Sequence, residues 1–152
     1  MYITRTPPSR LALGILLAGI FLWIGFIGAI SFMEAWLKFR APGVSLSVGL
    51  GIGKLVFHAL NKVELVLMVA IMLSLWKLRP QRRADYLVLV PVLILLIQVV
   101  FLMPILDQRA DAHIRGQEVA SSSVHLYYII GEVVKMIFLW WSGIYTLRQL
   151  IR

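Results

Sequence analysis

Two otherwise apolar stretches of the chain each carry a row of ionisable or hydrogen-bonding side chains. The rows consist of His58, Asn61 and Glu64 in one stretch, and of His125, Tyr128, Glu132 and Lys135 in the other. Spacings of three, four and seven residues place side chains on one face of an α-helix. Two such polar faces predict a site between two helices that binds a proton, an ion or a small polar ligand.

The two carboxylates of these rows fall at similar depths. Counted from Leu55 and Val124, Glu64 lies about 14 Å and Glu132 about 12 Å into its helix. A lipid-facing charge at such a depth is costly, so both side chains are expected to face protein. If they approach each other in a low dielectric, they do not both ionise, and one would hold a proton near neutral pH. With Lys135 beside them, the pair predicts a proton or cation station.

A purely structural role for the same groups stays open. Glu132 and Lys135 are three residues apart and can pair along one helix, where they would only align it with its neighbours. Glu34 lies at the outer end of the first apolar stretch and completes the set of candidate site residues on that side of the molecule. The sequence does not decide between an enzyme and a non-catalytic protein.

The two histidines leave cofactor chemistry as a further alternative. His58 and His125 could supply the two axial ligands of a haem held between helices. They could instead form a metal site together with a carboxylate, the candidates being Glu34, Glu64 and Glu132. The chain has no cysteine, so any such site would lack thiolate ligands. It also lacks the Glu-x-x-His pair that is typical of di-iron bundles.

The elements that must position these residues are membrane helices. Of 152 residues, 61% are hydrophobic and 14% charged, whereas soluble domains have about 25% charged residues. Four apolar stretches are long enough to cross a hydrocarbon core of about 30 Å. We predict an all-α integral membrane protein, a four-helix transmembrane bundle that forms one domain over residues 1–152. The predicted helices span about residues 11–37, 55–76, 86–106 and 124–147.

Two connections at the outer side are expected to be irregular. The first contains the break Ala41-Pro42-Gly43 and then a loosely structured segment with Gly49, Gly51 and Gly53. The second is the polar stretch 107–123, which is predicted to be a loop between the third and fourth helices.

The basic residues indicate an orientation. The net charge is +8, but the cations lie at helix ends and not in a patch interleaved with aromatic residues. This pattern favours contact with lipid headgroups over nucleic acid. Lysine and arginine are frequent in cytoplasmic loops, and they are concentrated in the segment 77–85, with others near both termini. We therefore predict a multi-pass protein of a bacterial inner membrane with both termini cytoplasmic.

Several local patterns resemble small uncharacterised bacterial four-helix membrane proteins. They are residues 31–43 (SFMEAWLKFRAPG), residues 51–57 (GIGKLVF), Leu106-Asp107-x-Arg109, and His125-x-x-Tyr128-x-x-x-Glu132-x-x-Lys135. More distantly, the chain is similar to the transmembrane-protein-205-type and anthrone-oxygenase-like families, which also have four short helices. The resemblance implies a four-helix membrane fold and assigns no activity or catalytic residue.

Three functional classes follow from the sequence. The favoured interpretation is a bundle that binds or transports a small ligand, an ion or a proton at a polar site in the outer half, between the second and fourth helices. The alternatives are a haem- or metal-binding membrane protein and a structural or accessory subunit. In addition to the lipid bilayer, the expected partners are a small ligand or ion, further copies of the chain, or a larger membrane complex.

Overall fold

The computed structural model describes residues 10–78 and 86–151. Within these ranges every element of regular structure is helical. The elements are α1 (Arg10–Ile27), η1 (Gly28–Glu34), α2 (Ala35–Leu37), η2 (Lys38–Arg40), α3 (Leu46–Leu78), α4 (Leu89–Ile97), η4 (Gln98–Leu102), α5 (Met103–Ile114) and α6 (Val124–Ile151). Of the η elements, η1 and η4 are π-helical and η2 is a 3₁₀ turn.

These elements form four continuous helical runs. The runs are Arg10–Arg40, Leu46–Leu78, Leu89–Ile114 and Val124–Arg148, with 31, 33, 26 and 25 residues. Each is apolar and long enough to cross a membrane, because a helix rises ~1.5 Å per residue and the hydrocarbon core is about 30 Å thick. The predicted all-α fold is therefore confirmed, and the chain is a multi-pass integral membrane protein.

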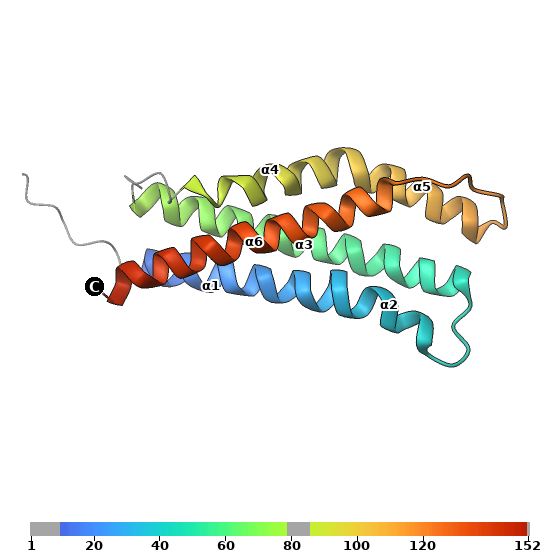
Figure 1. Ribbon diagram of the computed structural model, residues 1–152, viewed down its shortest axis with the longest axis horizontal. Helices are drawn as coiled ribbons and strands as arrows, with labels where there is room; N and C mark the ends of the chain where they lie inside the picture. The colour runs from blue at the N-terminus through green and yellow to red at the C-terminus, as the bar shows by residue number, and fades with distance from the viewer. Residues whose placement is uncertain (1–9, 79–85, 152) are drawn as a thin grey trace, which may run out of the picture.

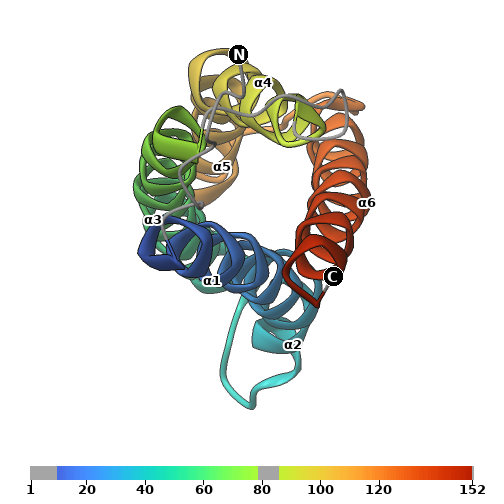
Figure 2. The ribbon, with the colours of Figure 1, turned by 90° about the vertical axis from the view of Figure 1, so that its left-hand side faces the viewer.

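The four runs stand side by side in a ring with up-and-down connections (Figures 1 and 2). α1 packs against α3 and α6, while α3 also contacts α5 and α4 also contacts α6. The run that contains α4 and α5 consequently lies opposite α1, as the view along the bundle shows (Figure 2). Every run can thus direct one face toward a common interior.

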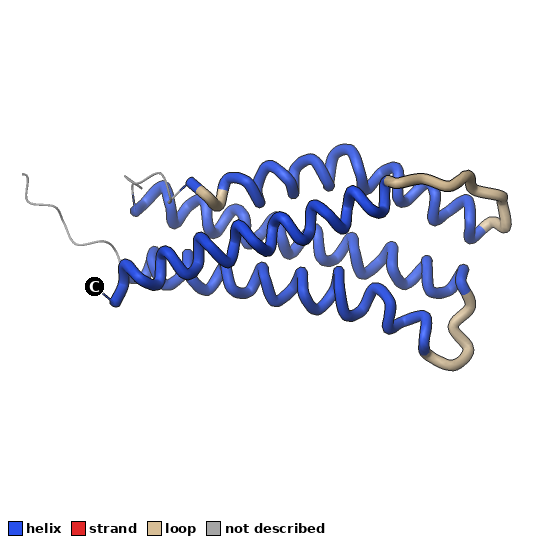
Figure 3. The backbone as a smooth tube through the Cα atoms, viewed as in Figure 1, coloured by secondary structure: helices blue, strands red, loops and turns tan. Residues whose placement is uncertain are grey.

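The bundle has two distinct ends (Figure 3). The start of α1, the end of α3, the start of α4 and the end of α6 gather at one end, which we call the terminal end. The connections 41–45 and 115–123 lie at the other, which we call the pocket end. Much of the predicted orientation rests on basic residues that lie outside the described residues, namely Arg5, Arg79, Arg82, Arg83 and Arg152. The side of the membrane that each end faces stays a prediction.

Two π-helical segments change the direction of their spans. A π turn holds more residues than an α turn and rotates the helical face that follows it. Beyond η1, α2 and η2 diverge from the line of α1 toward the pocket end (Figure 1). In the third span, η4 begins at Gln98, whose side chain is buried in the bundle. The bend of the first span thus follows η1, and η4 begins at a buried polar residue of the third span.

The glycine-containing segment 49–53, predicted to be loosely structured, lies inside α3. The prediction was wrong because it weighed only the low helix propensity of glycine. A side chain at Gly49 would strike the ring of Phe39, and one at Gly53 would strike the ammonium of Lys38. The absence of these side chains lets η2 pack closely on α3, and this packing offsets the low propensity.

The connection predicted for residues 107–123 is also shorter than expected, because α5 continues to Ile114. Its additional turns carry Asp107 and Asp111, which form ion pairs with side chains of α3. These pairs hold the polar end of α5 against the bundle. The prediction used only the run of apolar residues, so the predicted third helix ended where that run ends.

Apolar packing dominates the terminal half of the bundle, where the buried hydroxyls of Ser74 and Thr146 bond carbonyls of their own helices. The buried core there consists of Leu16, Ile20, Trp23, Ile27, Ile71, Leu75, Val88, Leu95 and Leu139. Large apolar side chains such as Leu22, Leu55 and Val66 are exposed on the outer surface, as expected of a protein that contacts lipid. Polar side chains gather inside the bundle between this core and the pocket end.

Candidate functional site

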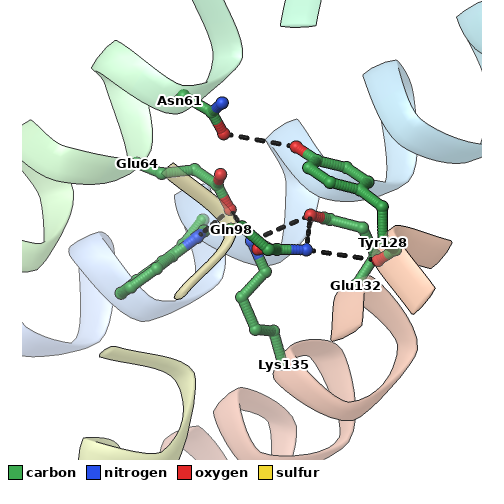
Figure 4. A network of polar contacts seen from close by, with 7 residues as sticks. Asn61, Glu64, Gln98, Tyr128, Glu132 and Lys135 are labelled. Carbon is green, nitrogen blue, oxygen red and sulfur yellow. Dashed lines mark hydrogen bonds and ion pairs between the residues drawn. The ribbon is translucent and has the colours of Figure 1, made fainter. Parts of the chain in front are cut away.

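A group of polar side chains lies inside the bundle, and all four runs contribute to it (Figure 4). We call it the central cluster: Trp23 of α1, Asn61 and Glu64 of α3, Gln98 of η4, and Tyr128, Glu132 and Lys135 of α6. No residue of the cluster is more than 5% exposed. Polar groups that are removed from water must find partners among themselves.

Two carboxylates and one ammonium form the middle of the central cluster. Lys135 Nζ donates to Glu64 Oε1 at 2.5 Å, across the interface between α6 and α3. The same nitrogen lies 2.9 Å from Glu132 Oε1 on its own helix. None of the three side chains has any exposed area. Lys135 therefore joins a local i,i+3 pair to a carboxylate that is distant in the sequence.

Neutral donors from the other two spans complete these contacts. Trp23 Nε1 donates to Glu64 Oε1 at 2.6 Å. Gln98 Nε2 donates to Glu132 Oε1 at 2.9 Å and to the backbone carbonyl of Tyr128 at 3.2 Å. Each carboxylate thus receives an ammonium and one neutral N–H on the same oxygen, and the central cluster connects all four spans.

The remaining oxygens of the central cluster lack donors. Within the described part of the chain, no hydrogen bond reaches Glu64 Oε2, Gln98 Oε1 or Glu132 Oε2. If both carboxylates were ionised, Lys135 would balance one of them and leave a net negative charge at full burial. A buried unbalanced charge is costly, and a proton on one carboxyl removes it. Lys135 alone therefore does not balance two ionised carboxylates in the central cluster.

A pocket of about 280 Å³ lies at the pocket end, between α2, η2, α3, α5 and α6. Its polar lining residues are Lys38, Lys54, Asp107, Arg109, His113, His125 and Tyr128. The rest of the lining is apolar or glycine, including Phe39, Leu50, Phe57 and Met103. Mostly apolar walls with a few placed polar groups are typical of small-molecule sites.

Three ion pairs surround this pocket, and we call them the pocket rim. They are Lys38–Glu34 at 3.1 Å, Lys54–Asp111 at 2.8 Å and His58–Asp107 at 2.8 Å. The first lies along one helical run, and the other two join α3 to α5. The Lys54 side chain is 30% exposed and that of His58 is 45% exposed, whereas that of Lys38 is only 8% exposed.

Tyr128 belongs to both the pocket and the central cluster. It lines the pocket and makes an edge-to-face contact with Phe57, at 5.5 Å between ring centroids. Its hydroxyl donates to Asn61 Oδ1 at 3.2 Å, and its backbone carbonyl accepts from Gln98. Tyr128 is only 1% exposed. Because it contacts both sites, it forms part of the wall between them.

Five of the sequence-predicted site residues meet in one place: Asn61, Glu64, Tyr128, Glu132 and Lys135. Glu132 faces the bundle interior as expected, but its described contacts reach α3 through Lys135 and not directly. Glu34 lies in the pocket rim, where it pairs with Lys38.

The structure places the two candidate histidines in different environments. His58 bonds Asp107 across the α3–α5 interface, and His125 lines the pocket from α6. Within the described ranges, no group of three or more histidine, aspartate or glutamate side chains is arranged to hold a metal ion. The haem and metal alternatives therefore gain no geometric support.

Sequence reasoning missed two members of the central cluster. Gln98 is not among the predicted site residues, although an isolated amide inside an apolar span is a signal for a buried polar partner. Trp23 is not among the candidate site residues predicted from the sequence, although tryptophan carries an N–H donor. Its position in the middle of the first span could have indicated an interior role, because interfacial tryptophans lie near span ends. The rim pairs Lys54–Asp111 and His58–Asp107 had no comparable signal.

Comparisons of the chain with protein-family models, with curated protein sequences and with solved structures found no match. The function must therefore be argued from the central cluster, the pocket and the membrane fold alone.

Proposed function

We propose that this membrane protein binds and exchanges a proton at the central cluster, with access from the pocket end. The observation that carries the proposal is the full burial of two carboxylates around one lysine, each carboxylate with an oxygen that accepts no hydrogen bond from the described residues. Ionisable groups that face the interior of a membrane bundle mark proton relays and ion pathways.

The second carboxylate distinguishes this arrangement from a simple structural ion pair. One acid would be enough to balance Lys135, yet Glu64 and Glu132 both contact its ammonium. The two acids therefore offer alternative positions for one proton on either side of a fixed positive charge. Because Trp23 and Gln98 hold the bonded oxygen of each acid, the other oxygen is the one available to carry the proton.

Access from the pocket end is supported by the position of Tyr128. Tyr128 lines the pocket, and its hydroxyl donates to Asn61 in the same polar network as the acids (Figure 4). Both groups can donate and accept hydrogen bonds, so they can take part in a relay with water that enters the pocket. The concentration of lysine and arginine in residues 77–85 supports a pocket end that faces outward from a bacterial inner membrane.

Infrared spectroscopy of the protein in lipid nanodiscs tests the proposal. The wild type is expected to show the C=O band of a protonated carboxyl, and Glu132→Gln or Glu64→Gln should remove or shift that band. In proteoliposomes either variant should also abolish dissipation of an imposed proton gradient.

Glu118→Gln provides a matched control, because Glu118 is an exposed acid in the connection 115–123. It should leave both the carboxyl band and the proton flux unchanged. A folded wild type without a protonated carboxyl, or a carboxyl band that both Glu64→Gln and Glu132→Gln leave as it is in the wild type, would contradict the proposal.

A further inference from the structure

The pocket contains a nearly buried ammonium. The Lys38 side chain is 8% exposed, and its Nζ bonds Glu34 Oε2 at 3.1 Å. The same nitrogen lies 5.4 Å and 5.5 Å from the ring centroids of Phe39 and Phe57. An ammonium has three N–H donors, and among the described residues only the Glu34 carboxylate accepts one of them. Lys38 can therefore donate to a molecule in the pocket.

The ammonium of Lys38 packs against α3 at Gly53, which has no side chain. A Cβ atom at Gly53 would lie 2.9 Å from Lys38 Nζ and 3.2 Å from its Cε. The charged end of Lys38 thus lies directly against a bare stretch of helix, where any larger residue would displace it. This contact fixes the ammonium at the wall of the pocket and shows that its position is built into the packing of η2 on α3.

Hydrogen-bond donors outnumber acceptors around the pocket. Lys54 donates to both oxygens of Asp111, and Arg109 donates to the backbone carbonyl of Ala120. Arg109 keeps further N–H groups, because a guanidinium has five, and the His125 ring also lines the pocket. Asp107 is the one acidic lining residue in the described part of the chain, and one of its oxygens is bonded to His58. A ligand that carries oxygen acceptors and a negative charge would satisfy these donors, and a cation would not.

The rest of the pocket lining is apolar and would favour a ligand with an apolar part next to its anionic group. Leu50 and Phe57 of α3, Phe39 of η2, and Met103 and Leu106 of the third span all contribute to the walls. The volume of about 280 Å³ lies just below the usual range for ligand pockets, which is about 300–1,000 Å³. A single ring or a short branched chain suits a space of this kind better than a large cofactor does.

We propose that the pocket binds a small amphiphilic acid, with its anionic oxygen group on Lys38 and its apolar body between Phe39 and Phe57. The same chemistry is offered by a free organic acid and by an anionic lipid whose headgroup enters the pocket. This inference is independent of proton binding at the central cluster, since it rests on residues of the pocket alone.

Calorimetric titration of the full chain in phosphatidylcholine nanodiscs tests the inference, with benzoate as the probe and benzyl alcohol as its uncharged counterpart. Benzoate is expected to bind saturably and benzyl alcohol more weakly.

Lys38→Gln should weaken benzoate binding about ten-fold or more, because a charge-assisted hydrogen bond is lost. Lys38→Arg, which keeps the charge, should retain part of the affinity. Lys62→Gln is the matched control, since Lys62 is exposed on α3 outside the pocket.

A second set of nanodiscs that contain phosphatidic acid separates the two sources of the ligand. Competition by this lipid would support binding of a lipid headgroup, and undiminished benzoate binding would support a free acid. The inference is overturned if benzoate does not bind saturably to the folded wild type, or if benzyl alcohol binds as tightly as benzoate. The comparison of benzoate with benzyl alcohol uses the wild type alone, so it does not depend on whether a variant folds. Equal affinity of a folded Lys38→Gln variant would also overturn it.

Discussion

The central cluster and the pocket rim use the same residue types under opposite conditions. In the cluster, Glu64, Glu132 and Lys135 have no exposed area. In the rim, the side chains of Lys54 and Asp111 are 30% and 40% exposed, although their ion pair is comparably short at 2.8 Å. Distance alone therefore does not distinguish the cluster from this exposed rim pair, and burial does.

The difference shows which charges must be balanced by the protein. Water and headgroups can solvate an excess charge at the rim, where screened ion pairs contribute little to stability. In the cluster no solvent is in contact with the charged groups, so an unbalanced carboxylate has to be neutralised by a proton or a partner. This contrast is why we place proton binding in the cluster and recognition of an external ligand in the pocket.

The largest effect is expected from removing the buried ammonium. Lys135→Met keeps an unbranched apolar stem but leaves both carboxylates without their shared cation. Breaking a buried ion pair on one side typically costs about 3–5 kcal/mol, and we expect the free energy of unfolding to fall by this amount. The measurement is denaturant-induced unfolding in detergent micelles, followed by tryptophan fluorescence.

The double variant Lys135→Met, Glu64→Gln sharpens this result. It removes one negative charge together with the positive one, so its loss of stability should be smaller than the sum of the two single losses. If Lys135→Met is as stable as the wild type, the cluster is not held by the lysine and its contrast with the rim disappears.

An intermediate effect is expected from the glycines that shape the pocket. Gly49→Ala places a methyl group against the Phe39 ring, and overpacking of this kind costs about 1–3 kcal/mol. Gly51→Ala is the matched control, because nothing lies within 4 Å of a Cβ atom at Gly51. Alanine there should stabilise the helix by up to about 1 kcal/mol. Thermal unfolding of both variants measures the difference, and equal shifts would contradict the close packing of η2 on α3.

The smallest effect is expected at the exposed rim pair. Lys54→Gln removes one partner of Asp111 while both positions stay accessible to water. We expect no measurable change in the unfolding transition, and any residual change should vanish at high salt because exposed ion pairs are screened. A loss of stability as large as that of Lys135→Met would show that burial does not separate the two regions.

The rows of polar residues on the second and fourth spans were predictable from the sequence because helix geometry is local. A repeat of 3.6 residues places His58, Asn61 and Glu64 along neighbouring positions whatever surrounds them. The depth of Glu132 followed from the rise per residue. The same reasoning left the partners open: it allowed Lys135 beside both acids or paired with Glu132 alone, and the folded bundle has Lys135 in contact with both.

The sequence by itself determined that this chain crosses the membrane four times and carries polar faces on two spans, since apolar length and helical spacing depend only on nearby residues. The tertiary structure decided which groups meet. The packing of α1 and of the third span against α3 and α6 brought Trp23 and Gln98 onto the buried acids. The close approach of η2 to α3 at Gly49 and Gly53 produced the pocket and buried the Lys38 ammonium. Such contacts depend on packing between distant segments, and no local pattern in the chain encodes them.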